Sequence, residues 1–187
     1  MKKIISAVFL SALATTAGAA TYQIDGHHTN ARFSIDHFNT STNVGGFYNL
    51  SGTLEFDPAK RTGSIDLSIP VNSIQTGSQD FTNHLKSADL FNAAKYPEIR
   101  FTSTKFNFNG KKLLSVDGKL TMLGKTHPVK LKAQKFNCYD SPILKTQVCG
   151  GDFTTTIDRT KWGINYLVDA GMTKQVALTI QIEAGKK

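Results

Sequence analysis

Histidine side chains are the first candidates for chemistry, because imidazole is the commonest metal ligand and titrates near neutral pH. The sequence holds five histidines, and the adjacent His27 and His28 would point to opposite faces of a strand. His37, His84 and His127 stand far apart, and no two histidines have the H-x-H or H-x-x-x-H spacing of a chelating site. The sequence therefore predicts no metal site and no cofactor.

Motifs for covalent catalysis and for phosphate binding are also missing. The chain contains no G-x-S-x-G elbow, no S-x-x-K and no G-x-G-x-x-G loop. Carboxylates are plentiful, but an acid–base pair would have to assemble from residues distant in the sequence. The sequence therefore predicts a protein that is not an enzyme.

The densest cluster of distinctive residues is Asp158-Arg159 followed by Trp162 and Gly163. In a functional interpretation, Arg159 anchors a polar headgroup and Trp162 lines the mouth of a pocket. In a structural interpretation, Arg159 pairs with Asp158 or Asp89, and Trp162, the only tryptophan, plugs the end of a barrel. We favour the structural interpretation.

The two cysteines, Cys138 and Cys149, lie 11 positions apart and flank the turn-forming residues 140–142 (DSP). They predict one disulfide that pins a hairpin tip, worth about 3 kcal/mol on the chain-entropy model. A metal or redox pair is the alternative, but C-x-x-C spacing and a nearby histidine are both missing.

The elements that position these residues are mostly strands, because polar and apolar residues alternate along much of the chain. The alternation predicts about eight strands, at residues 32–37, 50–56, 64–69, 99–101, 116–122, 129–131, 153–157 and 176–183. Asn109-Gly110 is the strongest hairpin signal between them.

One segment, residues 79–96, breaks this rhythm. Phe81 and Leu85 lie four positions apart, as on one face of a helix, Ser78 can cap its start, and Pro97 blocks its continuation. We expect a short helical insertion with a second turn beginning at Ser87.

Composition and length indicate one globular domain. Hydrophobic residues make up 40% of the 187 positions, which is too apolar for a disordered chain and too polar for a protein with many membrane spans. The predicted strands fit either a sandwich or a closed barrel, and periodicity does not choose between them.

The amino-terminal residues resemble a cleaved secretory signal. Lys2 and Lys3 precede an apolar stretch at residues 4–14 that is too short to span a bilayer, and residues 17–19 (AGA) form a cleavage site. We expect residues 1–19 to be removed and residues 20–187 to form one exported domain.

The net charge of +8 falls to +6 without Lys2 and Lys3. The remaining lysines are spread along the chain, so they predict solubility and mild attraction to anionic membrane surfaces rather than nucleic-acid binding.

Several segments of the sequence together form a recognisable pattern. The most specific is residues 84–93 (HLKSADLFNA), followed by Tyr96-Pro97 and Phe101. The other segments are residues 22–25 with His28, 33–37, 46–47, 54–58, 118–129 and 158–159. In this order the segments resemble the YceI-like family, and the resemblance covers essentially the whole predicted mature chain.

The resemblance implies an all-β fold, an extended antiparallel eight-stranded barrel similar to lipocalins, with the short helical insertion. It also implies a periplasmic protein that holds a polyisoprenoid lipid, of quinone or quinone-precursor type, in the barrel lumen. It supplies no catalytic residues, and it leaves open whether two chains form a homodimer.

The predicted lumen wall consists of large apolar side chains on the dry faces of the strands. They are Phe33, Ile35, Phe47, Leu54, Leu67, Ile69, Phe101, Leu120, Leu131, Phe153, Leu178 and Ile180. Phe81, Leu85 and Phe91 are expected to close one end of the lumen, and Trp162 to flank the other. In the alternative, the same side chains fill a solid core, and the chain is a secreted stress or interaction protein without a lipid.

Overall fold

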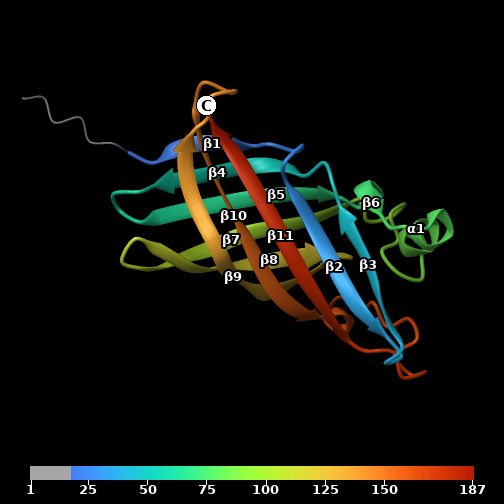
Figure 1. Ribbon diagram of the computed structural model, residues 1–187. Helices are drawn as coiled ribbons and strands as arrows, with labels where there is room; N and C mark the ends of the chain where they lie inside the picture. Colours follow the sequence, from blue (N-terminus) through green and yellow to red (C-terminus); the bar gives the residue numbers. More distant parts are fainter. Residues whose placement is uncertain (1–17) are drawn as a thin grey trace, which may run out of the picture.

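The computed structural model describes residues 18–187, most of which lie in strands (Figure 1). Residues 1–17 of the predicted signal lie outside the described residues. The strands are β1 (Ala20–Ile24), β2 (Asn30–His37), β3 (Ser41–Phe47), β4 (Ser51–Asp57), β5 (Thr62–Pro70), β6 (Ile74–Gln75), β7 (Glu98–Asn109), β8 (Lys112–Met122), β9 (Lys125–Asp140), β10 (Gln147–Asp158) and β11 (Gln175–Lys186). The helical segments are η1 (Val71–Ser73), α1 (Gln79–Lys86) and η2 (Arg159–Trp162).

Eight of these strands close into an antiparallel barrel, in the order β1-β4-β5-β7-β8-β9-β10-β11. The ring closes because β11 returns to pair with β1, with Tyr22 opposite Lys186 and Ile24 opposite Ala184. The predicted lipocalin-like barrel is therefore confirmed, and the sandwich is excluded.

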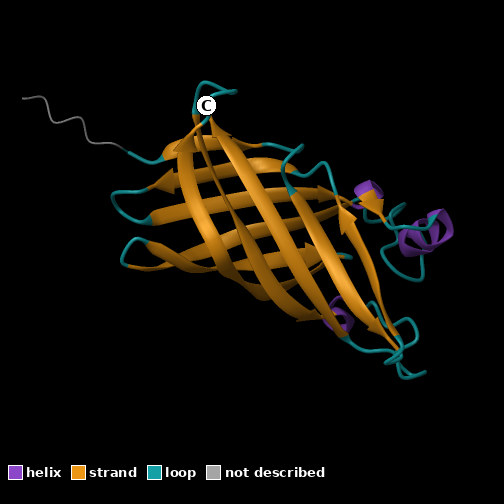
Figure 2. Cartoon of the chain, in the orientation of Figure 1, coloured by secondary structure: helices purple, strands orange, loops and turns teal. Residues whose placement is uncertain are grey.

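The edge of β11 that faces away from β10 pairs with two strands. Its carboxyl end pairs with β1, whereas residues 177–181 pair with β2. From β2 the sheet continues through β3 to the two-residue strand β6. Figure 2 shows that the helical segments gather toward one end of the barrel, whereas tight hairpin turns lie at the opposite end.

The predicted helix forms where expected but is short. The Ser78 side chain accepts a hydrogen bond from the Phe81 amide at 3.3 Å, which caps the first turn of α1. The helix ends at Lys86. A turn begins at Ser87 as expected, with the Leu90 amide donating to the Ser87 carbonyl at 3.2 Å, but it does not continue as a helix. The Phe91 amide bonds back to the Leu85 carbonyl at 3.0 Å, so this connection folds against the helix.

One glycine is required by the packing of the interior. The Phe101 ring of β7 lies across Gly118 of β8, and a Cβ atom at Gly118 would stand 2.3 Å from the ring. A larger residue at this position would displace Phe101 into the barrel.

The predicted disulfide is also confirmed. Cys138 of β9 and Cys149 of β10 lie directly opposite each other and are bonded. The bond lies at the end of the β9–β10 hairpin that carries its connecting loop, whereas η2 follows the other end of β10.

We predict that replacing Cys138 and Cys149 together with alanine lowers the free energy of unfolding by about 3 kcal/mol, because the unfolded chain regains its loop entropy. Urea denaturation measures the change. Wild-type protein unfolded in a reducing agent serves as the control and should match the variant. A variant as stable as the oxidised wild type would contradict the prediction.

Candidate functional site

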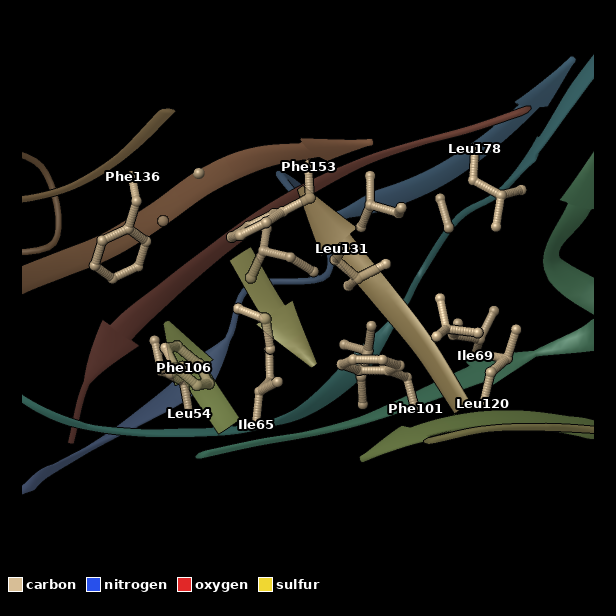
Figure 3. A pocket seen from close by; sticks show the side chains of 18 residues that line it. Leu54, Ile65, Ile69, Phe101, Phe106, Leu120, Leu131, Phe136, Phe153 and Leu178 are labelled. Carbon is tan, nitrogen blue, oxygen red and sulfur yellow. The ribbon is translucent and has the colours of Figure 1, made fainter. Parts of the chain in front are cut away.

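The barrel interior holds a small cavity of about 80 Å³, which we call the inner cavity. Figure 3 shows side chains from opposite strands converging on it, with carbon atoms alone at its walls. The lining residues are Ala31, Leu54, Ile65, Leu67, Ile69, Phe101, Phe106, Val116, Leu120, Val129, Leu131, Phe136, Gly150, Gly151, Phe153, Leu178, Ile180 and Ile182. Nothing on this wall can hydrogen-bond a ligand through a side chain, so it favours an apolar molecule.

A larger cavity of about 340 Å³, the outer cavity, lies between β2, β3, helix α1 and the β10–β11 loop. Its walls are also mainly apolar, but five side chains with polar atoms line it: His37, Asn43, His84, Arg159 and Tyr166. A volume of this size falls in the range of small-molecule sites.

The two cavities meet at a ring of four residues. Ala31, Ile69, Leu120 and Leu178 line both of them. The cavities therefore lie end to end, with the apolar one deeper in the barrel and the partly polar one beside α1.

The residues predicted to form the lumen wall are brought together, with one exception. Leu54, Leu67, Phe101, Leu131, Phe153 and Ile180 line the inner cavity; Phe33, Ile35, Phe47, Phe81, Leu85 and Phe91 line the outer one; Ile69, Leu120 and Leu178 line both. Their contact with a ligand stays a prediction.

The exception is Trp162, which lines neither cavity. Its side chain is 2% exposed, and its indole N–H donates to the Leu120 carbonyl at 3.1 Å. The ring also meets His127 edge-on at 5.1 Å between centroids. Trp162 thus packs on the β8–β9 hairpin.

Trp162 was expected to flank the end of the lumen away from the helix, and the structure places it elsewhere. Tyr166, four residues further along the chain, contacts His84 of α1 with ring centroids 4.8 Å apart. The segment after β10 therefore lies at the same end as the helix. This position agrees with the structural interpretation of Trp162 as a plug.

Arg159 is 4% exposed and holds the β10–β11 loop through backbone carbonyls. Its Nε donates to Thr173 at 3.0 Å, and its Nη1 donates to Ile164 at 3.2 Å and to Tyr166 at 2.9 Å. Burial lowers the pKa of the guanidinium, although arginine stays charged in proteins.

The expected ion pair of Arg159 with Asp158 or Asp89 is wrong. The ion pairs within residues 18–187 do not include Arg159. Asp158 instead accepts bonds from the Thr160 hydroxyl at 2.6 Å and the Thr160 amide at 3.0 Å, and these bonds lower the pKa of its carboxyl.

Sequence reasoning missed part of the wall. Phe106 and Phe136 face the inner cavity, and the alternation within β7 and β9 was a signal that could have found them. Tyr166, Leu167 and Met172 face the outer cavity from an irregular loop, for which periodicity gives no signal.

Within the described residues, no cluster of three or more histidine, cysteine or acidic side chains is arranged to hold a metal. No helix among residues 18–187 has the length and apolar character needed to cross a membrane.

Comparison with known proteins gives consistent matches. The model of the YceI-like domain matches residues 22–184. Protein YceI of Salmonella agona is 36% identical over 146 residues, which cover 75% of this chain and 76% of that protein.

Solved structures share the fold. The Campylobacter jejuni YCEI protein has a TM-score of 0.70 at 24% identity, covering 98% of this chain and 99% of that chain. A domain from Saccharophagus degradans, described as polyisoprenoid-binding and implicated in plant cell wall breakdown, has a TM-score of 0.67 at 14% identity, covering 90% of this chain and 99% of that chain.

We predict that Trp162→Phe lowers the free energy of unfolding by about 1–3 kcal/mol, because the buried Leu120 carbonyl loses its donor. Chemical denaturation followed by circular dichroism measures the change. Tyr166→Phe is the matched control, since the Tyr166 side chain is exposed and its substitution should change stability by less than about 0.5 kcal/mol. Equal effects of the two substitutions would show that the indole bond contributes nothing.

Proposed function

The chain belongs to the YceI-like family, and on that premise we propose that it is a periplasmic binding protein that sequesters a long-chain polyisoprenoid lipid, of quinone or quinone-precursor type. The observation that carries this proposal is the pair of end-to-end cavities with apolar walls. The similar domain described as polyisoprenoid-binding supports the same ligand class.

The binding energy available to such a ligand is large enough without any polar contact. A prenyl chain of about 40 carbons, at about 0.3 kcal/mol per heavy atom, reaches about 12 kcal/mol. This corresponds to a dissociation constant near the nanomolar range. Because the inner cavity has a volume of only about 80 Å³, a chain of this length must push its side chains aside.

Two features support the proposed compartment. Residues 1–19 have the pattern of a cleaved secretory signal, and the Cys138–Cys149 bond is of a kind that persists in oxidising compartments. A homodimer stays a prediction.

Two other functions compete with this proposal. A secreted stress or interaction protein with a solid core is favoured by the small volume of the inner cavity, whereas the outer cavity favours the lipid carrier. The family and the similar domain favour binding over catalysis. An enzyme that alters its bound lipid would be revealed by product formed on incubation.

We predict that Leu67→Trp fills the inner cavity and weakens binding of a long-tailed polyprenyl quinone by at least about tenfold, because the deep end of the tail loses its site. A quinone with one or two isoprene units should bind as before, since the outer cavity is intact. Uptake is quantified by extraction of the loaded protein and mass spectrometry.

Leu114→Trp is the matched control, because Leu114 is exposed on the outer face of β8. It should leave both quinones unaffected. Unchanged binding of the long-tailed quinone by a folded Leu67→Trp variant would argue against a ligand in the inner cavity.

We further propose that lipid enters at the outer cavity, through transient contact of this end with an anionic membrane surface. Tyr166 and Leu167 line that cavity and are each 39% exposed, and Phe38 is 37% exposed next to His37 on the same wall. Exposed aromatic and aliphatic side chains suit the membrane interface.

For this contact we predict that Leu167→Asn lowers partition onto vesicles containing anionic lipid by about fivefold, because part of a leucine side chain no longer inserts. Ile143→Asn is the control, since Ile143 is 86% exposed on the β9–β10 loop at the opposite end. Sedimentation with vesicles measures both variants, and an equal loss in both would contradict docking through the outer cavity.

A further inference from the structure

Arg159 is the one buried cation among residues 18–187, and it lacks an anionic partner. The cations that do form ion pairs in the described part of the chain are exposed. Arg100, for example, pairs with Asp66 on the outer surface. Burying a charge is costly unless a counter-charge or several hydrogen bonds compensate for it. Three carbonyl oxygens supply part of this compensation at Arg159 and leave its net charge in place.

The guanidinium is held in one orientation with one nitrogen unused. Nε and Nη1 are fixed by the carbonyls of Thr173, Ile164 and Tyr166, whereas Nη2 is buried without a hydrogen-bond partner. Arg159 also lines the outer cavity. A buried donor that its own chain leaves unused is expected to meet an acceptor from elsewhere.

The other polar groups of the outer cavity indicate the charge of that acceptor. His37, Asn43 and His84 line the same cavity, and no aspartate or glutamate does. The neighbouring acid, Asp158, attracts the Arg159 charge through space, but it makes no ion pair with Arg159 and accepts its hydrogen bonds from Thr160. The polar part of the cavity is therefore rich in donors and carries a positive charge.

The two cavities also fix the direction of a bound amphiphile. The inner cavity offers only carbon to a ligand, so it suits a prenyl tail (Figure 3). The outer cavity combines apolar walls with the polar groups, so the head of the molecule lies there.

We propose that Arg159 anchors an anionic oxygen headgroup, a carboxylate or a phosphate, with Nη2 donating to one of its oxygens. This inference rests on the proposed function and narrows its ligand class to polyprenyl lipids with an acidic head, such as acidic quinone precursors. Hydrogen bonds between ionised groups are stronger than neutral ones, so the charge on the head should matter more than its size.

The test compares four probes that share one tail: geranylgeraniol, geranylgeranyl monophosphate, geranylgeranoic acid and a geranylgeranyl benzoquinone. Binding to wild-type protein is measured by titration at constant ionic strength. We expect the phosphate or the acid to bind at least about tenfold more tightly than the alcohol and the quinone. The stronger of the two acidic probes identifies the headgroup.

Arg159→Gln removes the charge and should abolish this preference. The readout is the ratio of the affinities for the acidic probe and the alcohol, because a loosened β10–β11 loop would weaken the binding of both probes alike. If the variant does not fold, the wild-type series decides alone.

Equal affinity of the wild type for all four probes would overturn the inference and leave the lipid carrier standing. A preference for the acidic probes that persists in folded Arg159→Gln would overturn the role of Arg159. Failure of every probe to bind would instead overturn the proposed function, and the headgroup inference with it.

Discussion

The pairing of β1 with β11 is the constraint on which the rest of the molecule depends. The seam is short, since it joins residues 22–24 to residues 184–186, but it closes eight strands into a ring. Side chains reinforce it: Tyr22 is fully buried, and its hydroxyl donates to Gln147 of β10 at 2.6 Å. Closure leaves the ring without a free edge and separates an interior from water. An interior of this size has to be filled by side chains or by a ligand.

The way β11 divides its edge shapes the end of the interior beside helix α1. Because residues 177–181 of β11 pair with β2 instead of β1, the sheet continues through β3 and β6 toward helix α1. The outer cavity forms between this extension, the helix and the β10–β11 loop. Arg159 fixes that loop through three carbonyls, so one residue shapes the cavity wall and brings the charge to it. The anchor of the loop and the proposed headgroup site therefore coincide at this end, whereas the disulfide lies at the opposite end.

Much of this architecture could be predicted from the alternation of residue types, and the failures have physical causes. Strand β5, with Ile65, Leu67 and Ile69 facing inward, shows a strict period of two. Strands β1, β3 and β6 were not predicted. Strand β1 has only five residues, residues 41–46 of β3 (STNVGG) hold one apolar side chain, Val44, among polar residues and glycines, and the two residues of β6 carry no period. Yet β3 positions Asn43 and Phe47 at the outer cavity.

The hydrogen-bond partners of Arg159 could not be predicted from the sequence, for a different reason. Its partners are carbonyl oxygens, which every residue possesses, so no residue type marks them. Reasoning from charge alone therefore paired Arg159 with acids that the fold uses elsewhere or leaves distant. The buried faces of the strands, by contrast, were predictable because burial selects apolar residue types directly.

The central claim, that the two cavities hold a polyisoprenoid lipid, is tested most directly by what leaves the protein on organic extraction. Protein purified from its native compartment without detergent is extracted, and the extract is analysed by mass spectrometry. The mass of the intact protein is measured by native mass spectrometry. If the two cavities hold a polyisoprenoid lipid, the extract should contain about one long-chain isoprenoid molecule per protein chain, from a single class of ligand. Protein that is repeatedly empty, and that takes up no added polyprenyl quinone or acidic prenyl lipid, would contradict it.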